Sequence, residues 1–206
     1  MGCMFYWHPD IEEFITAKRT PNKLDKFNVS VCCTNEFMDK VCRVESTGID
    51  ENWDLVFPDT TFGKYSDEWN GDINLWKNKG YPYKVWKTIS IKYLWDLLLR
   101  STYEYNDPGI LFNNRADYTH LDNFDVSIYE PNPCGEQFMP RGSVCDLGSI
   151  ILTSLYKNNK FDFDALRSSV YTLIRFLDDV NDYSKAPLSE YEWKAKNKRR
   201  VGAGLS

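Results

Sequence analysis

The residues best suited to chemistry lie in one short stretch, Asn132-Pro133-Cys134-Gly135-Glu136-Gln137. Proline and glycine on either side of the cysteine predict a tight, exposed turn with the sulfur at its tip. Asn132 and Glu136 stand two residues before and after Cys134, so the turn can direct all three side chains into one space. A thiol between a hydrogen-bond donor and a carboxylate base forms a candidate reaction centre. An inert turn cysteine is the alternative interpretation.

The carboxylate of Glu136 indicates which thiol chemistry this turn favours. A neighbouring negative charge disfavours ionisation of a thiol, whereas nucleophilic catalysis needs the thiolate. We therefore expect Cys134 to act as a neutral thiol, which suits radical or redox chemistry.

A second candidate, Cys145, lies eleven residues further on, between Gly142 and Gly148. Two glycines around a cysteine on an apolar strand predict that another backbone approaches closely there. A buried structural cysteine is the alternative interpretation.

Composition limits the class of protein. The 206 residues carry 25 Lys and Arg against 30 Asp and Glu, a net charge of −5, which argues against nucleic acid as the main partner. No apolar run approaches the roughly 18 residues of a membrane span, and the N-terminus lacks a secretory signal, so a cytoplasmic protein is expected. The six cysteines form no CxxC pair and the two histidines, His8 and His120, are far apart, so no metal site is predicted.

The elements that must position these residues alternate between strands and helices. Strands are expected at 3–6, 27–33, 54–57, 110–113, 144–156 and 201–206, and helices after Pro9, Ser90 and Asp162 or Asp164. Residues 62–83 show no period and predict an ordered segment held by aromatic rings. We expect 144–156 and 201–206 in the interior, and the last helix should bury Leu166, Val170, Leu173, Ile174, Leu177 and Val180. The basic run of 194–200 is interpreted as a solvated face. This alternation is typical of α/β architecture.

The cysteine motifs closely resemble the active-site segment of the ribonucleotide reductase catalytic (large) subunit. The resemblance includes the segment from Gly142 to Ile150 and continues through blocks in family order, at residues 8–15, 26–30, 35–38, 107–112, 175–178 and 199–202. The motifs are most similar to those of the adenosylcobalamin-dependent class II enzymes and their phage relatives, although class I subunits share the same core. It implies that 1–206 is a central fragment of a ten-stranded α/β barrel, with Cys134 on an inserted finger loop.

The resemblance also implies a role for each site residue. Cys134 becomes a thiyl radical that takes hydrogen from C3′ of the ribose, Glu136 takes the 3′-hydroxyl proton, and Asn132 binds the sugar hydroxyls. Cys145 is one of two thiols that reduce the intermediate after the 2′-hydroxyl leaves as water. Such chemistry requires a dry pocket, so that the radical is not quenched. Ile151 departs from the family, which usually has asparagine there.

The loop of 18–26 resembles the family loop that relays a bound effector nucleotide to the substrate base. Lys18, Arg19 and Lys23 are candidate phosphate or base contacts there, and ordinary solvated charges are the alternative.

The implied partners follow from the resemblance. They are a ribonucleoside di- or triphosphate, nucleotide effectors, a thioredoxin- or glutaredoxin-type reductant, flanking reductase fragments and a second copy in a dimer. The implied radical source is adenosylcobalamin in class II or a radical-generating small subunit in class I.

The family subunits are much longer than this chain. We expect the second redox cysteine to precede the equivalent of Met1, so the isolated chain should show no turnover. A reductase assembled with neighbouring fragments is one interpretation, and an inactive remnant or interaction module is the other.

Overall fold

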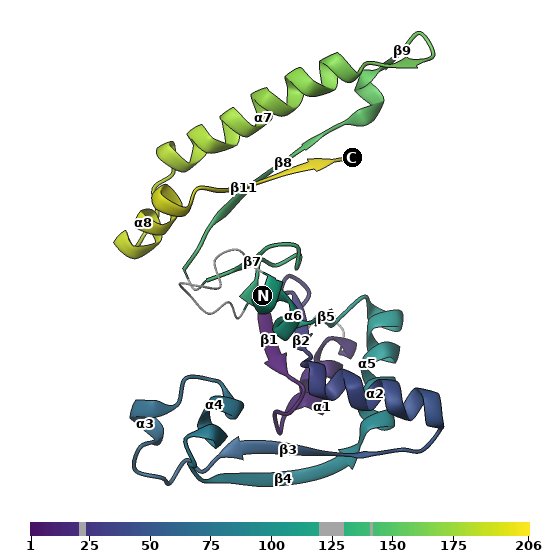
Figure 1. Cartoon of the computed structure of the whole chain (residues 1–206), viewed down its shortest axis with the longest axis vertical. Helices are drawn as coiled ribbons and strands as arrows, with labels where there is room; N and C mark the ends of the chain where they lie inside the picture. Colours follow the sequence, from purple (N-terminus) through teal and green to yellow (C-terminus); the bar gives the residue numbers. More distant parts are fainter. Residues whose placement is uncertain (21–23, 120–129, 141) are drawn as a thin grey trace. The chain divides into compact units, whose positions relative to one another are not determined.

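The computed structural model describes residues 1–20, 24–119, 130–140 and 142–206, in two units, Met1–Phe138 and Met139–Ser206 (Figure 1). The first contains β1 (Gly2–Phe5), α1 (Ile11–Thr16), β2 (Val29–Cys32), α2 (Asn35–Thr47), β3 (Asn52–Pro58), α3 (Tyr65–Glu68), α4 (Ile73–Asn78), β4 (Tyr83–Ser90), α5 (Ile91–Tyr105), β5 (Gly109–Leu111), α6 (Asn113–Thr119) and β6 (Glu130–Pro131). After β7 (Phe138–Met139), the second contains β8 (Cys145–Ile150), β9 (Tyr156–Lys157), β10 (Lys160–Phe161), α7 (Phe163–Tyr183), α8 (Ser189–Lys198) and β11 (Arg200–Leu205). Short 3₁₀ turns lie at Ala17–Arg19 and Leu152–Leu155.

A parallel sheet in the order β1-β2-β5 forms the frame of the first unit. Its register pairs Val31 with Met4 on one side and with Ile110 on the other. Because side chains alternate along a strand, Val31 and Cys33 face one side while Ser30 and Cys32 face the other. The strands expected near 3–6, 27–33 and 110–113 are therefore confirmed, with slightly different ends.

Helices cover the face of this sheet that carries Val31. The helix expected after Ser90 is confirmed as α5, in which Ile91, Leu94 and Leu98 form one fully buried apolar stripe. The helix begins where the capping residue predicts, because Ser90 Oγ accepts a hydrogen bond from the Tyr93 amide at 2.9 Å. Helix α5 packs against both α1 and α2.

The segment of 62–83 is ordered by its rings, as predicted. Trp76, 2% exposed, is its centre, with its ring centroid 4.9 Å from that of Tyr81 and 5.7 Å from that of Trp69. Its indole N–H donates to the Pro82 carbonyl at 2.9 Å. A buried indole whose polar group is satisfied stabilises an otherwise irregular segment.

Two elements of the first unit were not anticipated. Helix α2 buries Phe37, Val41 and Val44, a spacing of four and three residues that was present in the sequence. Strand β4 pairs antiparallel with β3. Six of its eight residues are exposed, including Trp86, so the strand lacks the alternation of buried and exposed side chains by which a strand is recognised.

The second unit is built on a β-α-β arrangement in which β8 and β11 pair in parallel and α7 packs on both. Asp162 caps α7, since its side chain accepts from the Ala165 amide at 2.8 Å. At Gly148 a Cβ atom would lie 2.7 Å from Leu173 Cδ1. A close approach does occur at this glycine, but it is made by the Leu173 side chain of α7 and not by another backbone as predicted.

The expectation that this unit's strands and helix face are interior was wrong in part. Of the six α7 positions expected on the buried side, Leu177 is buried, while Val170 and Ile174 are exposed. Leu147 and Ile151 are 52% and 61% exposed, and Leu205 at the end of β11 is 61% exposed. The physical reason is that a two-stranded sheet offers a helix a narrow surface, and in the described part of this unit α7 covers one face of it.

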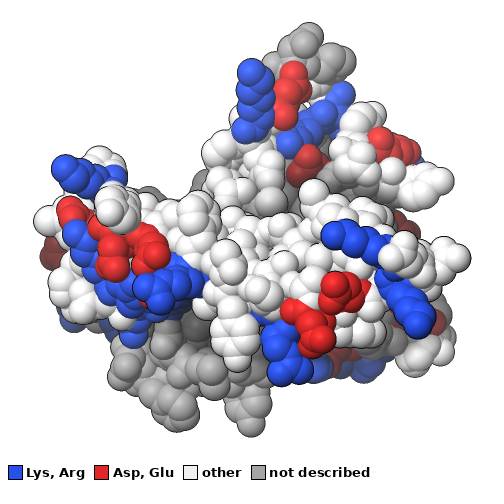
Figure 2. Space-filling view, turned by 90° about the horizontal axis from the view of Figure 1, so that it is seen from above, with Lys and Arg blue, Asp and Glu red and all other residues white. Residues whose placement is uncertain are grey.

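The basic run of 194–200 is more organised than a solvated face. Lys194 and Lys196 pair with glutamates four residues earlier on α8. Arg199 leaves the helix with a left-handed backbone, φ 45°, and its guanidinium binds Asp178 and Asp182 of α7, each at 2.7 Å. Figure 2 likewise shows basic and acidic side chains beside one another on the face that it draws.

The local architecture is α/β, but the described strands form separate sheets of two or three and close no barrel. The ten-stranded barrel and the finger loop stay predictions. No helix in the described ranges combines the length and apolar character needed to cross a bilayer.

The Arg199 cluster predicts a pH-dependent contribution to stability. Hydrogen bonds from Arg199 lower the pKa of both Asp178 and Asp182 in the folded state. Stabilisation from a lowered carboxyl pKa is present above the unfolded value of about 3.9 and is lost as the pH falls through the folded value. Arg199→Ala should therefore melt below the parent at pH 7, and the difference between the two melting midpoints should be smaller at pH 3.

Thermal unfolding followed by circular dichroism at both pH values tests this. Lys92→Ala, which removes an exposed pair with Asp96 on α5, is the matched control and should change the midpoint little at either pH. A difference between Arg199→Ala and the parent that does not change with pH would contradict the assignment.

Candidate active site

The predicted cysteine turn lies between β6 and β7. The Asn132 amide donates to the Gln137 carbonyl at 3.0 Å, and the Gly135 amide donates to the Asn132 carbonyl at 2.9 Å. The Gln137 amide donates in turn to Asn132 Oδ1 at 3.1 Å. Cys134 stands at the exposed tip of this turn, as its flanking proline and glycine predict.

The turn also brings together the two polar side chains that flank the cysteine. Asn132 Nδ2 donates a hydrogen bond to Glu136 Oε1, so the amide holds the carboxylate in place. Asn132 is half-buried, whereas Cys134 and Glu136 are exposed. The sequence-predicted trio is therefore local to one turn, with an acceptor for a proton and a donor for a hydroxyl beside a thiol.

Gly135 makes this geometry possible. Its φ of 85° lies in the left-handed region, which favours glycine. A Cβ atom at this position would lie 3.6 Å from Leu111 Cδ2 of β5, so the turn rests against the sheet. Any other residue would strain the backbone next to the reactive thiol.

A cavity of about 300 Å³ adjoins Cys134 at the edge of the sheet where β2 and β5 begin. At its floor a Cβ on Gly109 would lie 2.8 Å from Ser30 Oγ, so the two strands leave no room for a larger side chain. The lining comes from three stretches of chain: Asn28–Ser30, then Asn106, Asp107 and Gly109–Leu111, and Pro133–Gly135. This volume falls at the lower end of the range for small-molecule sites.

Cys145 belongs to the second unit. It lies on β8 opposite Arg200 of β11, and its Sγ would be 4.0 Å from a Cβ on Gly202. The space beside Gly202 is filled by the Leu147 side chain, whose Cδ2 would lie 2.5 Å from the same Cβ. Cys145 is half-buried.

The structure gives the candidate effector-loop residues internal contacts. Lys18 Nζ lies 2.7 Å from Asp107 Oδ2, with both side chains largely buried. The Arg19 guanidinium donates to Ser101 Oγ at 2.7 Å, and Ser101 is fully buried. Lys23 falls outside the described residues. Neither alternative for Lys18 and Arg19, a nucleotide contact or a solvated charge, had anticipated these partners.

Two other cysteines, on and next to β2, differ from Cys134 in burial. Cys32 and Cys33 are each 1% exposed. A hydrogen bond with Cys3, reinforced by burial, raises the pKa of Cys32, and burial raises the pKa of Cys33 to about 12. Both thiols therefore stay protonated and unreactive at neutral pH. Within the described ranges no cluster of three or more His, Cys, Asp or Glu could hold a metal ion.

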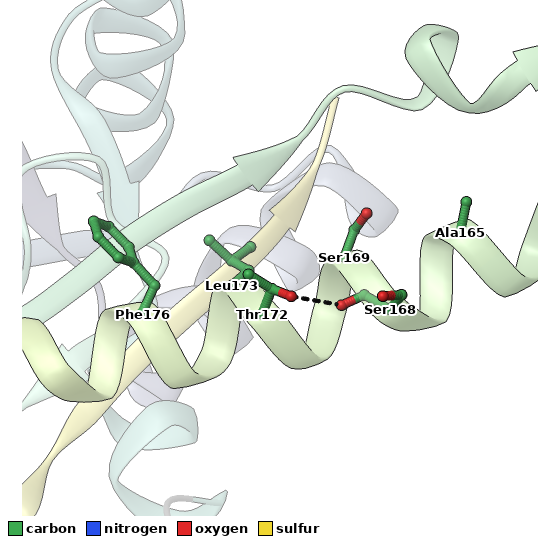
Figure 3. A pocket seen from close by; sticks show the side chains of 6 residues that line it. All are labelled: Ala165, Ser168, Ser169, Thr172, Leu173 and Phe176. Carbon is green, nitrogen blue, oxygen red and sulfur yellow. Dashed lines mark hydrogen bonds between the residues drawn. The ribbon is translucent and has the colours of Figure 1, made fainter.

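A larger pocket, of about 540 Å³, lies along the exposed surface of α7 (Figure 3). Its lining is Ala165, Ser168, Ser169, Thr172, Leu173 and Phe176, and the Thr172 hydroxyl donates to the Ser168 carbonyl at 3.0 Å. These lining side chains include no group that titrates near neutral pH. The pocket therefore offers no acid, base or reactive thiol, unlike the cavity at Cys134.

Sequence reasoning missed the roles of Asn28 and Asp107. Both line the cavity beside Cys134, and both fall in blocks that carried the family resemblance, 26–30 and 107–112. The blocks marked these segments, but nothing in them indicated that they meet the cysteine turn.

Comparison with known proteins gives one consistent result. A family model described as "Ribonucleotide reductase, barrel domain" matches residues 1–206. A vitamin B12-dependent ribonucleoside-diphosphate reductase of Thermoplasma acidophilum is 34% identical over all of this chain and 23% of that protein. One of Mycobacterium tuberculosis is 30% identical, covering all of this chain and 26% of that protein. A ribonucleoside-diphosphate reductase large subunit of Trypanosoma brucei brucei is 28% identical over 97% of this chain and 24% of that protein. The chain thus spans about a quarter of the length of these relatives.

The turn geometry predicts that Gly135→Ala is destabilising. A Cβ at φ 85° costs about 1 kcal/mol, so the free energy of unfolding of the first unit should fall by roughly that amount. Urea unfolding measures the change. Gly63→Ala is the matched control, because its φ is not left-handed and no atom lies within 4 Å of the added methyl. Equal stability of the two variants would contradict the strained geometry at Gly135.

Proposed function

This chain belongs to the ribonucleotide reductase barrel-domain family, and we propose that it supplies the reactive turn of a reductase catalytic subunit. The substrate class is a ribonucleoside di- or triphosphate, and the product is the 2′-deoxyribonucleotide. The observation that carries the proposal is the turn itself, in which Asn132 is hydrogen-bonded to Glu136 and Cys134 lies at the exposed tip beside the 300 Å³ cavity.

In this proposal the first step is a hydrogen-atom transfer at Cys134. The S–H bond forms as the C3′–H bond of the ribose breaks, so the unpaired electron moves from sulfur to C3′. The Glu136 carboxylate accepts the proton of the 3′-hydroxyl, and the Asn132 amide orients the sugar hydroxyls. The pre-organised turn favours this step because both polar groups are already held within reach of one ligand.

The second step consumes two thiols. Loss of the 2′-hydroxyl as water takes up a proton, and reduction of the resulting intermediate takes two electrons. Cys145 and a second thiol supply these two electrons by forming a disulfide. Cys134 then returns its hydrogen atom to C3′, which restores the sulfur radical, and Glu136 returns the proton to the 3′-oxygen. A dithiol reductant of the thioredoxin or glutaredoxin class then returns both cysteines to the thiol state. The assignment of Cys145 is supported by its partial exposure on β8.

The radical must come from a separate generator. The relatives named vitamin B12-dependent support adenosylcobalamin, which when bound supplies the radical that takes the hydrogen atom from a thiol. The described lining of the 300 Å³ cavity does not fit this cofactor, because a corrin ring is far larger than a sugar and the lining offers no imidazole. We therefore assign no residue of this turn to cobalamin.

The exposure of Cys134 bears on how the site works. Radical chemistry requires exclusion of water, and the described residues leave the turn exposed. The proposal therefore requires that a bound substrate and further parts of the subunit cover the tip.

The proposed function predicts that turnover depends on Cys134. The assay mixes the chain with polypeptides that supply the flanking segments of the Thermoplasma acidophilum relative, and follows conversion of CDP and CTP with adenosylcobalamin and a dithiol. Cys134→Ser should lower turnover at least about 10³-fold, since serine cannot form the sulfur radical. Cys42→Ser, at an exposed cysteine on α2, is the matched control and should keep parent activity.

Two results would overturn the proposal. Parent-level turnover in Cys134→Ser would show that this thiol carries no radical. A parent chain that binds the flanking segments without any turnover would favour the alternative of an interaction module.

A further inference from the structure

The position of Cys134 depends on a contact from a distant part of the chain. Asn28, the residue just before β2, donates from its side-chain Nδ2 to the Pro133 carbonyl at 2.7 Å. The acceptor is a carbonyl, so the amide group of Asn28 must present its nitrogen and not its oxygen. The contact thus needs a donor at position 28.

The acceptor is the carbonyl group most directly linked to the cysteine. The Pro133 carbonyl and the Cys134 amide belong to one peptide group, whose atoms lie in a plane. A hydrogen bond that fixes the carbonyl direction also fixes the plane from which the Cys134 side chain emerges. The other hydrogen bonds described for the turn join residues 132–137 to one another. They hold its shape but do not orient it toward the sheet.

Asn28 is itself anchored to the sheet. Its carbonyl accepts a hydrogen bond from the Gly2 amide at 2.9 Å, next to the first β1–β2 pair. The following residue, Val29, is 3% exposed. Because this backbone is fixed to the sheet, the Asn28 side chain holds the group that it binds at a defined position relative to β2.

The cavity joins the same two segments. Asn28 and Cys134 both line the 300 Å³ cavity, and Gly135 rests against Leu111 on its other side. The turn is therefore joined to the sheet by the hydrogen bond at Pro133, and Gly135 lies close enough to β5 that a Cβ atom there would touch Leu111 Cδ2.

From these contacts we infer that Asn28 is a positioning residue for Cys134, which orients the Pro133–Cys134 peptide toward the cavity. Its hydrogen bond is a property of the chain itself, whereas its effect on reduction rests on the proposed function. A thiol that must reach one hydrogen atom of a sugar is sensitive to its direction, since a misplacement of about 1 Å can cost about 100-fold in rate.

Order in the turn provides a test that needs no turnover. In the ¹⁵N-labelled chain the order parameter of the Cys134 amide should be near 0.85 in the parent, and should fall toward 0.6 or below in Asn28→Ala and Asn28→Asp. Aspartate has nearly the shape of asparagine but no donor. Asn28→Gln, which keeps the donor, should restore part of the order.

The control makes the same chemical change where no donor is needed. Asn70→Asp keeps the side-chain oxygen that accepts from the Asp72 amide, and should leave the Cys134 amide unchanged. Unchanged order at Cys134 in both Asn28→Ala and Asn28→Asp would overturn the inference, and so would loss of order with Asn28→Gln equal to that with Asn28→Ala.

The turnover assay described above supplies the second readout. Asn28→Asp should lower kcat about 10- to 100-fold and change KM less than about twofold, because it misplaces the thiol without removing a group that binds substrate. A parent-like kcat would refute the positioning role in catalysis. Lower order in Asn28→Asp together with full activity in Cys134→Ser would instead refute the proposed function and leave the structural contact standing.

Discussion

Parallel β-strands must be covered on both faces, because their connections place other elements above and below the sheet. Strand β2 shows the consequence directly, since all four of its residues are buried. On the face of Val31 the cover is the apolar core between the sheet and its helices, α1, α2 and α5. The other face of the sheet carries Cys32 and its register partner, Leu111 of β5. On that face the cover includes the turn of 132–137, where a Cβ atom on Gly135 would lie 3.6 Å from Leu111. The placement of the reactive turn is thus part of how the sheet is completed.

Burial distinguishes Cys32 and Cys33 from Cys134. Cys32 and Cys33 lie inside the sheet, where desolvation keeps the thiols protonated. Cys134 has the opposite setting, at the exposed tip of a polar turn that also holds an amide and a carboxylate. The sheet beside the turn therefore carries two buried, unreactive thiols, whereas the thiol of the turn is accessible.

The second unit is also built on parallel strands covered by a helix, with two strands in place of three. Helix α7 approaches β8 closely because Gly148 has no side chain, and the chain returns in β11 parallel to β8. The return is held by Arg199, whose guanidinium bridges two carboxylates of α7 just before β11 begins. Two blocks of the family resemblance, 175–178 and 199–202, therefore meet at one ion-pair cluster. Asp178 and Arg199 of these blocks thus have a structural role in this unit, independent of the chemistry proposed for Cys134.

Features that depend on neighbours in the chain could be predicted from the sequence alone. The turn around Cys134, the cap at Ser90, the apolar stripe of α5 and the family all follow from residue types at short spacing, because local hydrogen bonds and periodicity are set by adjacent residues. Tertiary structure decided the rest. The hydrogen bond between Asn28 and Pro133 joins residues 105 positions apart in the sequence, and the ion pair between Lys18 and Asp107 joins residues 89 positions apart. Such partners are chosen by how the sheet and helices pack, and so is the exposure of α7, which depends on the width of the sheet beneath it. Residue pattern therefore determined which groups can react, and packing decided what holds them in place.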